Sequence, residues 1–90
     1  MNEHHWKVFI PERVDKELSK LPPEIRERIE RAMMQLARNP FSSGVEKMEG
    51  EPERWRLRVG KYRIVFRIEK SERTVVVTAI GHRRDVYRRR

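Results

Sequence analysis

The chain has 90 residues, 37% of them hydrophobic and 40% charged, with a formal net charge of +8, which predicts one small basic domain over residues 1–90. It has no cysteine, so disulfide bonds, a thiolate nucleophile and a cysteine-ligated zinc site are excluded. No apolar run reaches ten residues, so we expect a cytoplasmic protein with neither a signal peptide nor a membrane span.

The first half of the chain predicts one strand followed by two helices. Apolar residues alternate from His5 to Ile10, as in a short strand. Pro11 suits the first turn of a helix that ends before Pro22, and its apolar residues at helical spacing are Val14, Leu18 and Leu21. A second helix is predicted from Pro23 to Asn39-Pro40, with an apolar stripe of Ile25, Ile29, Ala32, Met33 and Leu36.

The second half predicts three strands after a polar connector at residues 39–53. The strands cover residues 54–59, 62–69 and 73–80, and turns at Gly60-Lys61 and Lys70-Ser71-Glu72 separate them. The order β-α-α-β-β-β predicts an α+β fold. We expect an antiparallel four-stranded sheet with the helix hairpin on one face and a short C-terminal segment.

The positive charge is confined to the second half of the chain. Residues 1–53 contain nine basic and eleven acidic residues, a net of −2, whereas residues 54–90 contain thirteen and three, a net of +10. If the apolar residues of the strands face the helices, the opposite face carries Arg56, Arg58, Arg63 and Arg67. Such a cluster predicts a polyanionic partner, either nucleic acid or an acidic protein.

Two segments resemble a known family of proteins. The segment WRLRVGKYRIVF at residues 55–66 and the ending IGHRRDVY at residues 80–87, together with the predicted order of elements, are similar to the RelE/ParE superfamily of toxins. These toxins belong to type II toxin–antitoxin systems, and the pattern is closer to the RelE branch. The resemblance covers nearly the whole chain, although the helical half matches in pattern only.

The resemblance to the RelE branch implies an activity and a set of site residues. It implies an endoribonuclease that enters the ribosomal A site and cuts messenger RNA there by attack of a ribose 2′-OH on the adjacent phosphate, with no metal or other cofactor. The family's chemistry is carried by two basic strand positions, the arginine of a Tyr-Arg pair, a C-terminal basic residue and a tyrosine. In this sequence they correspond to Arg56 and Arg58, to Arg63, to His82 or Arg83, and to Tyr87.

This reaction needs a base, an acid and groups that stabilise negative charge on the phosphate. Arginine suits the last role because its guanidinium group binds phosphate oxygens bidentately, but it is not readily deprotonated. Bacterial relatives carry lysines at the two basic strand positions. A histidine titrates near neutrality, and a tyrosine does so only if nearby arginines lower its pKa from about 10. We therefore hypothesise that His82 or Tyr87 is the base and that Arg63, with Arg83 or Arg58, holds the phosphate.

Two other functions stay open, a ParE-like inhibitor of DNA gyrase and an inactive domain that only binds an antitoxin. The basic C-terminal segment with its tyrosine favours the ribonuclease. In every case the resemblance implies a cognate RelB-like antitoxin, with operator DNA bound only through that antitoxin. The ribonuclease also implies the ribosome with messenger RNA in its A site and ribosomal RNA as partners, and no membrane.

Overall fold

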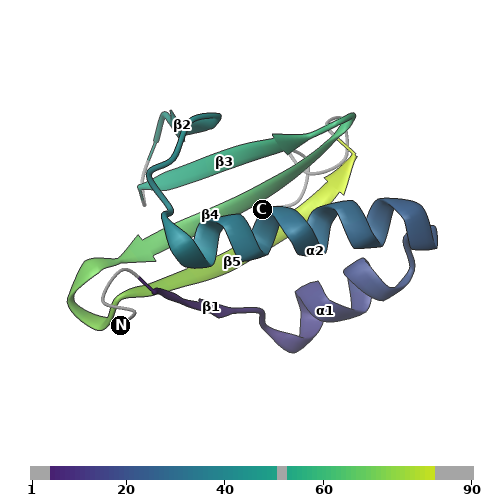
Figure 1. Ribbon diagram of the computed structural model, residues 1–90, viewed down its shortest axis with the longest axis horizontal. Coiled ribbons are helices and arrows are strands. Elements are labelled where there is room, and N and C mark those ends of the chain that lie inside the picture. Colours follow the sequence, from purple (N-terminus) through teal and green to yellow (C-terminus); the bar gives the residue numbers. More distant parts are fainter. Residues whose placement is uncertain (1–4, 51–52, 83–90) are drawn as a thin grey trace.

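The computed structural model describes residues 5–50 and 53–82, which form a sheet covered by two helices (Figure 1). In chain order the elements are β1 (Lys7–Phe9), α1 (Glu12–Ser19), α2 (Pro23–Arg38), β2 (Val45–Met48), β3 (Arg54–Val59), β4 (Tyr62–Glu69) and β5 (Thr74–His82). A short 3-10 turn, Lys70–Glu72, joins β4 to β5. In this described part of the chain, no helix is long and apolar enough to cross a membrane.

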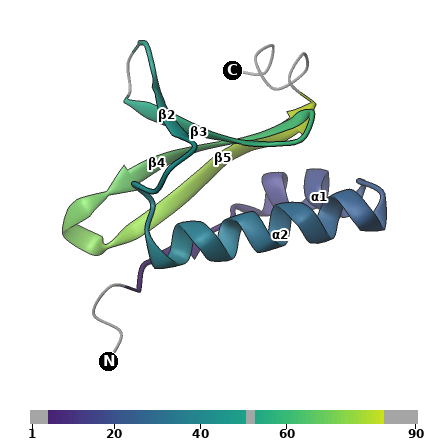
Figure 2. The same ribbon diagram turned by 45° about the horizontal axis from the view of Figure 1, so that its top comes forward.

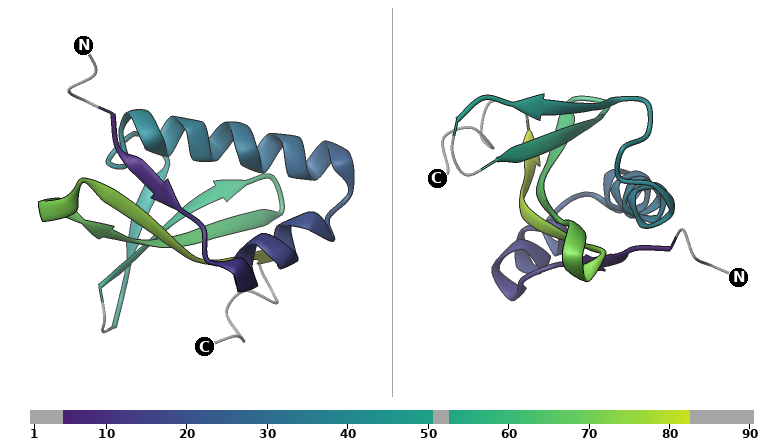
Figure 3. Two further views of the ribbon diagram at one scale, coloured as in Figure 1. Left: turned by 90° about the horizontal axis from the view of Figure 1, so that it is seen from below. Right: turned by 90° about the vertical axis from the view of Figure 1, so that its left-hand side faces the viewer.

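The strands form one sheet in the order β1-β5-β4-β3-β2. Neighbouring strands are antiparallel except for β1 and β5, which are parallel. Both helices lie on the same side of this sheet, as Figure 2 and the end-on view in Figure 3 show. The predicted α+β class, with a helix pair on one face of the sheet, is therefore confirmed.

The prediction of a four-stranded, fully antiparallel sheet was wrong in two respects. A fifth strand, β2, lies within the segment that we had predicted to be a polar connector. It is short and charged, which is typical of an edge strand that must not recruit another chain. Strand β1 is parallel to β5, and the long connection that a parallel pair requires contains both helices.

The two helices are joined by a tight turn that an arginine holds together. Helix α1 ends at Ser19, before the Leu21 that its apolar spacing included. Helix α2 begins at Pro23, where the missing N–H of proline costs no hydrogen bond. The Arg26 guanidinium Nη1 lies 3.4 Å from the Leu21 carbonyl oxygen and 3.5 Å from that of Ser19. It thus donates to carbonyls that the end of α1 leaves without a helical partner.

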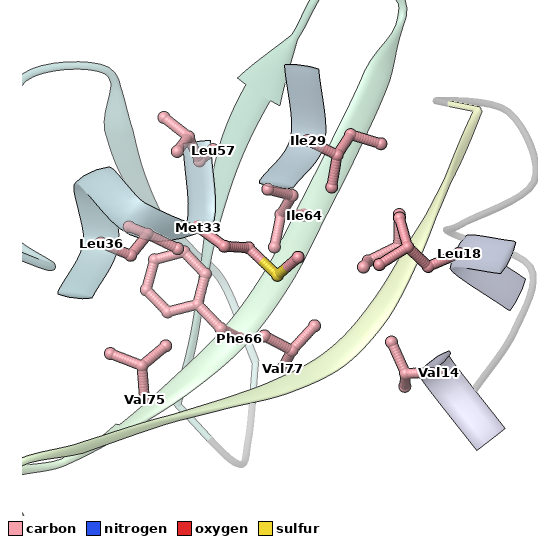
Figure 4. Packing of buried hydrophobic residues seen from close by; sticks show 11 residues of the cluster. Val14, Leu18, Ile29, Met33, Leu36, Leu57, Ile64, Phe66, Val75 and Val77 are labelled. Atoms are coloured by element: carbon pink, nitrogen blue, oxygen red, sulfur yellow. The ribbon is translucent and has the colours of Figure 1, made fainter. Parts of the chain in front are cut away.

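The core lies between the helices and the central strands. Figure 4 shows the side chains of α1 and α2 directed at those of β4 and β5. The buried members of the core are Val14, Leu18, Ile29, Met33, Leu36, Leu57, Ile64, Phe66, Val75, Val77 and Ile80. Since Ile64 and Phe66 are fully buried, the core fixes the orientation of β4 and therefore which of its residues face away from the helices.

Three aromatic rings close the core beyond the C-terminal end of α2. The ring of Phe41 makes edge-to-face contacts with Trp6 at 5.8 Å and with Trp55 at 6.3 Å between centroids. The backbone N–H of Phe41 donates to Asn39 Oδ1 at 3.0 Å, which fixes the turn after α2. Both tryptophans pack against the core, so the cluster supports the fold.

Candidate functional site

The sheet face that is turned away from the helices carries the four predicted arginines of β3 and β4, Arg56, Arg58, Arg63 and Arg67, and also Arg54 at the start of β3. These residues alternate along β3 and β4 with Leu57, Ile64 and Phe66, which are buried in the core. Successive side chains of a strand point to opposite faces, so the predicted placement of all four arginines on one face is confirmed. We call this surface the arginine face.

Arg58 and Arg63 lie directly opposite one another at the end of this face that is nearest the turn between β3 and β4. Directly paired residues of antiparallel strands have Cβ atoms about 5 Å apart, at which distance like charges repel. Arg58 is exposed and forms no hydrogen bond or ion pair with any residue that the structure describes. Two arginines on directly opposed positions of one face favour a site for an anion such as a phosphate.

Arg63 differs from the other arginines of the face in its burial. This residue is only 8% exposed. Its partner on β5 is Gly81, which has no side chain to compete for space beside it. Val65, two residues further along the same face, is also buried although it lies outside the core cluster. Of the opposed pair, Arg63 is therefore buried and Arg58 is exposed.

Strand β2 brings a carboxylate to the arginine face. Glu46 pairs with Arg56 across the edge of the sheet. The Arg56 Nε and Nη2 atoms donate to the same oxygen, Glu46 Oε1, at 3.0 and 2.8 Å. Sequence reasoning missed Glu46 because only four residues form the strand. The available signal was the pair of glycines that bracket it, Gly44 and Gly50, whose φ angles are +95° and +109°.

The arginines keep Glu46 ionised. The hydrogen bond from Arg56 lowers the pKa of this carboxyl below its usual value of 4.5, and the charge of Arg56 lowers it further. Desolvation opposes these two effects and is smaller than either, and the charges of Arg58 and Arg63 lower the pKa by smaller amounts still. Glu46 is therefore a carboxylate at neutral pH, and its side chain is 54% exposed.

A second carboxylate lies at the far end of the arginine face. The Arg67 Nε and Nη2 atoms donate to Glu69 Oε2 at 3.2 and 3.0 Å. These residues are two positions apart on β4 and therefore share a face. Arg56 and Arg67 are thus each paired with a carboxylate of the same face, whereas the exposed charge of Arg58 lies beyond Arg56, toward the turn between β3 and β4.

His82 occupies the other side of the sheet. It pairs directly with Tyr62, and the two rings meet edge to face with centroids 5.8 Å apart. Tyr62 packs against the core, so His82 faces the helices, whereas Arg63 faces away from them. The structure thus brings Arg56, Arg58 and Arg63 together but places His82 apart from them. The two remaining predicted site residues, Arg83 and Tyr87, lie outside the described residues.

Comparisons with known proteins support one family. The sequence matches the family described as "ParE toxin of type II toxin-antitoxin system, parDE" over residues 8–87. It is 36% identical over 75 residues to Toxin RelG of Mycobacterium tuberculosis, a match that covers 82% of this chain and 86% of the relative. It is also 27% identical over 86 residues to the Putative toxin RelE1 of Methanocaldococcus jannaschii, with 92% and 96% coverage.

Solved structures of similar proteins have the same fold. The toxin–antitoxin complex RelBE2 of Mycobacterium tuberculosis contains a chain that superposes with a TM-score of 0.79 at 27% identity, covering 92% of this chain and 97% of that one. The isolated RelE toxin of E. coli superposes with a TM-score of 0.75, covering 86% of this chain and 83% of that one. Its 23% identity supports similarity of fold alone.

Proposed function

Given that this chain belongs to the RelE/ParE superfamily of type II toxins, we propose that it is a ribosome-dependent endoribonuclease that cuts messenger RNA in the A site. In the proposed reaction, a ribose 2′-OH attacks the adjacent phosphate and the 5′ oxygen leaves. The relatives named RelG and RelE1 favour this branch of the superfamily. Ribosomal RNA would be a further contact of the basic surface.

The observation that carries this proposal is the directly opposed pair Arg58 and Arg63 on the arginine face. As the 2′ oxygen attacks, negative charge builds up on the non-bridging oxygens of the phosphate. Two preorganised guanidinium groups stabilise that charge more strongly than they stabilise the starting phosphodiester, which is the requirement for catalysis. We assign Arg58 and Arg63 to this role. Arg83 and Tyr87 are further candidates, as the resemblance to the RelE branch implies.

A direct test uses the purified chain with ribosomes that carry a defined messenger RNA. Primer extension on the messenger is expected to detect cuts in phase with codons, and only when ribosomes are present. The same messenger without ribosomes is the control. Cuts that ignore the reading frame, or no cuts at all, would contradict the proposal.

Inhibition of DNA gyrase is a second candidate, which the ParE description of the matching family favours. It predicts a DNA-damage response after induction of the gene, with messengers left intact. The ribonuclease predicts the reverse. Measuring both responses after the same induction therefore separates the two functions, and the lack of either response would favour an inactive domain that only binds an antitoxin.

We further propose a cognate RelB-like antitoxin as partner, as in the RelBE2 complex of Mycobacterium tuberculosis. Operator DNA would be bound only through that antitoxin. An acidic segment of the antitoxin would complement the arginine face and fold as it binds. Arg63→Ala is expected to abolish toxicity and to leave antitoxin binding largely intact. Loss of both together, with a lowered melting temperature, would assign Arg63 a structural role instead.

A further inference from the structure

The proposed reaction needs a group that removes the proton from the 2′-OH. The arginines of the arginine face cannot do so, because a guanidinium group stays protonated at neutral pH. Among the described residues, the side chains of this face that can accept a proton are the carboxylates of Glu46 and Glu69. Among the described residues of this face, these two carboxylates are the candidates for the base.

Glu46 has one oxygen fixed and the other available. Both hydrogen bonds from Arg56 end on Oε1, and Oε2 accepts none from any described residue. A carboxylate held through one oxygen keeps a fixed orientation and presents the other oxygen to a substrate. Its side chain is 54% exposed, so RNA can reach it.

The register places this carboxylate beside the proposed phosphate site. Glu46 lies directly opposite Arg56, and Arg58 is its diagonal neighbour on the same face. Diagonal neighbours on adjacent antiparallel strands lie about 7–8 Å apart at Cα, within reach of two long side chains. A phosphate bound by Arg58 and Arg63 therefore has a carboxylate at its side.

We propose that Glu46 is the general base of the reaction, an inference that rests on the proposed ribonuclease function. Glu46 Oε2 takes the proton of the 2′-OH while the bond from the 2′ oxygen to phosphorus forms. The bond from phosphorus to the 5′ oxygen breaks, and the leaving alkoxide takes a proton from water. The products are a 2′,3′-cyclic phosphate and a 5′-hydroxyl end, and Glu46 returns its proton to solvent.

Glu69 provides a matched control. It also accepts two hydrogen bonds from one arginine on the same face. It lies six residues from Arg63 along β4, which corresponds to about 20 Å at 3.3 Å per residue. Removing its charge changes the field of the face without touching the proposed site of proton transfer.

The test compares wild type, E46Q, E46D and E69Q in single-turnover cleavage of messenger RNA on the ribosome. General bases contribute about 10²- to 10⁴-fold, so E46Q is expected to lose at least about 100-fold in rate. E46D keeps a carboxylate and is expected to retain part of the activity, and E69Q is expected to match wild type. Binding to the programmed ribosome should be as tight as in wild type, or tighter, because E46Q removes a negative charge from a cationic face.

The pH dependence distinguishes a carboxylate from a histidine. The groups that face Glu46 are Arg54, Arg56 and Arg58 from β3 and Arg63 from β4, and arginines stay charged between pH 6 and 8. A Glu46 base therefore predicts a wild-type rate that is level over this range, and an unchanged rate in H82A. A histidine base predicts a rate that falls tenfold per pH unit below about 6.5, and loss of activity in H82A.

The outcomes separate the role of Glu46 as the base from the ribonuclease function itself. If wild type and E46Q cleave equally fast, the role of Glu46 is overturned and the ribonuclease function stands. The same holds if the wild-type rate falls below about pH 6.5 and H82A is inactive, as a histidine base predicts. If wild type leaves ribosome-bound messenger intact, the ribonuclease function falls, and the role of Glu46 falls with it. Matching melting temperatures of E46Q and wild type show that a lost rate is chemical, and partial activity in E46D supports the same conclusion should E46Q be less stable.

Discussion

At the scale of single residues, the arginines of the sheet differ in what surrounds them although their spacing makes them look equivalent. Arg56 is paired with Glu46 and Arg67 with Glu69, while Arg63 is buried. Arg58 is exposed and makes no ion pair with a described residue. An anion that approaches this surface therefore meets Arg58 first, because no carboxylate has to be displaced from it.

Arg58→Ala is expected to reduce the single-turnover rate on the ribosome by about 10²- to 10³-fold, the usual effect of removing one charge-stabilising donor. Arg58→Lys should be intermediate because it keeps the charge but loses the bidentate geometry. The melting temperature should stay the same or rise, since a like-charged cross-strand neighbour of Arg63 is removed. A wild-type rate in Arg58→Ala would contradict the role of this residue in the site.

At the scale of elements, the edge strand β2 changes the chemistry of the face although it has only four residues. It places Glu46 next to Arg56 and thus adds a proton acceptor to the part of the arginine face that carries Arg58 and Arg63. The turn between β4 and β5, in contrast, contributes to the stability of the fold. Its last residue, Arg73, adopts φ +47° and ψ +50°, and its guanidinium lies 4.9 Å from the centre of the Trp6 ring.

Two substitutions of Arg73 separate its backbone strain from its cation–π contact. Arg73→Ala removes the contact and keeps the left-handed backbone, so it should destabilise the domain by about 0.5–1 kcal/mol. Arg73→Gly removes the contact too but relieves a left-handed strain of about 1–2 kcal/mol, so it should be at least as stable as wild type. Denaturant unfolding of the three proteins checks this order. Equal losses in both variants would show that the backbone is unstrained.

At the scale of the whole molecule, a thin core supports a highly charged surface. The net charge of +8 combines a slightly acidic helical half with a strongly basic half that contains the arginine face. Because the helices cover one side of the sheet (Figure 2), the arginine face lies on the side of the sheet away from them. A long polyanion therefore has a preferred side from which to approach.

Binding of single-stranded RNA should weaken with salt, since each phosphate contact releases counterions. Arg58→Ala is expected to reduce the slope of log affinity against log salt by about 0.7, the value for one contact to a single strand. Arg31→Ala is the matched control, because Arg31 is an exposed residue of α2 on the other side of the protein. Equal changes of slope in the two variants would mean that RNA binds without a preferred face.

Acid should destabilise the folded domain through two exposed ion pairs. Hydrogen bonds from Arg56 and from Lys47 lower the pKa values of Glu46 and Glu53 below their usual 4.5. Their stabilising contribution is therefore complete above pH 4.5 and is lost as the pH falls through the lowered values. The melting temperature of wild type should fall more steeply below that pH than that of the double variant E46Q/E53Q. Identical pH dependence in both proteins would contradict this assignment, and E30Q, a change on the exposed side of α2, serves as control.

The sequence by itself determined the α+β class, the helix pair and the placement of four arginines on one face. These features depend on local periodicity, because a period of two or of 3.6 residues fixes which side chains share a surface. The parallel pairing of β1 with β5 and the existence of β2 were decided by the tertiary structure, since a four-residue edge strand has too little pattern to be recognised. Only the register between strands could bring Glu46 to Arg56, bury Arg63 and turn His82 toward the helices. Periodicity places a residue on a face of its own strand, but which residues of other strands become its neighbours depends on how the whole chain packs.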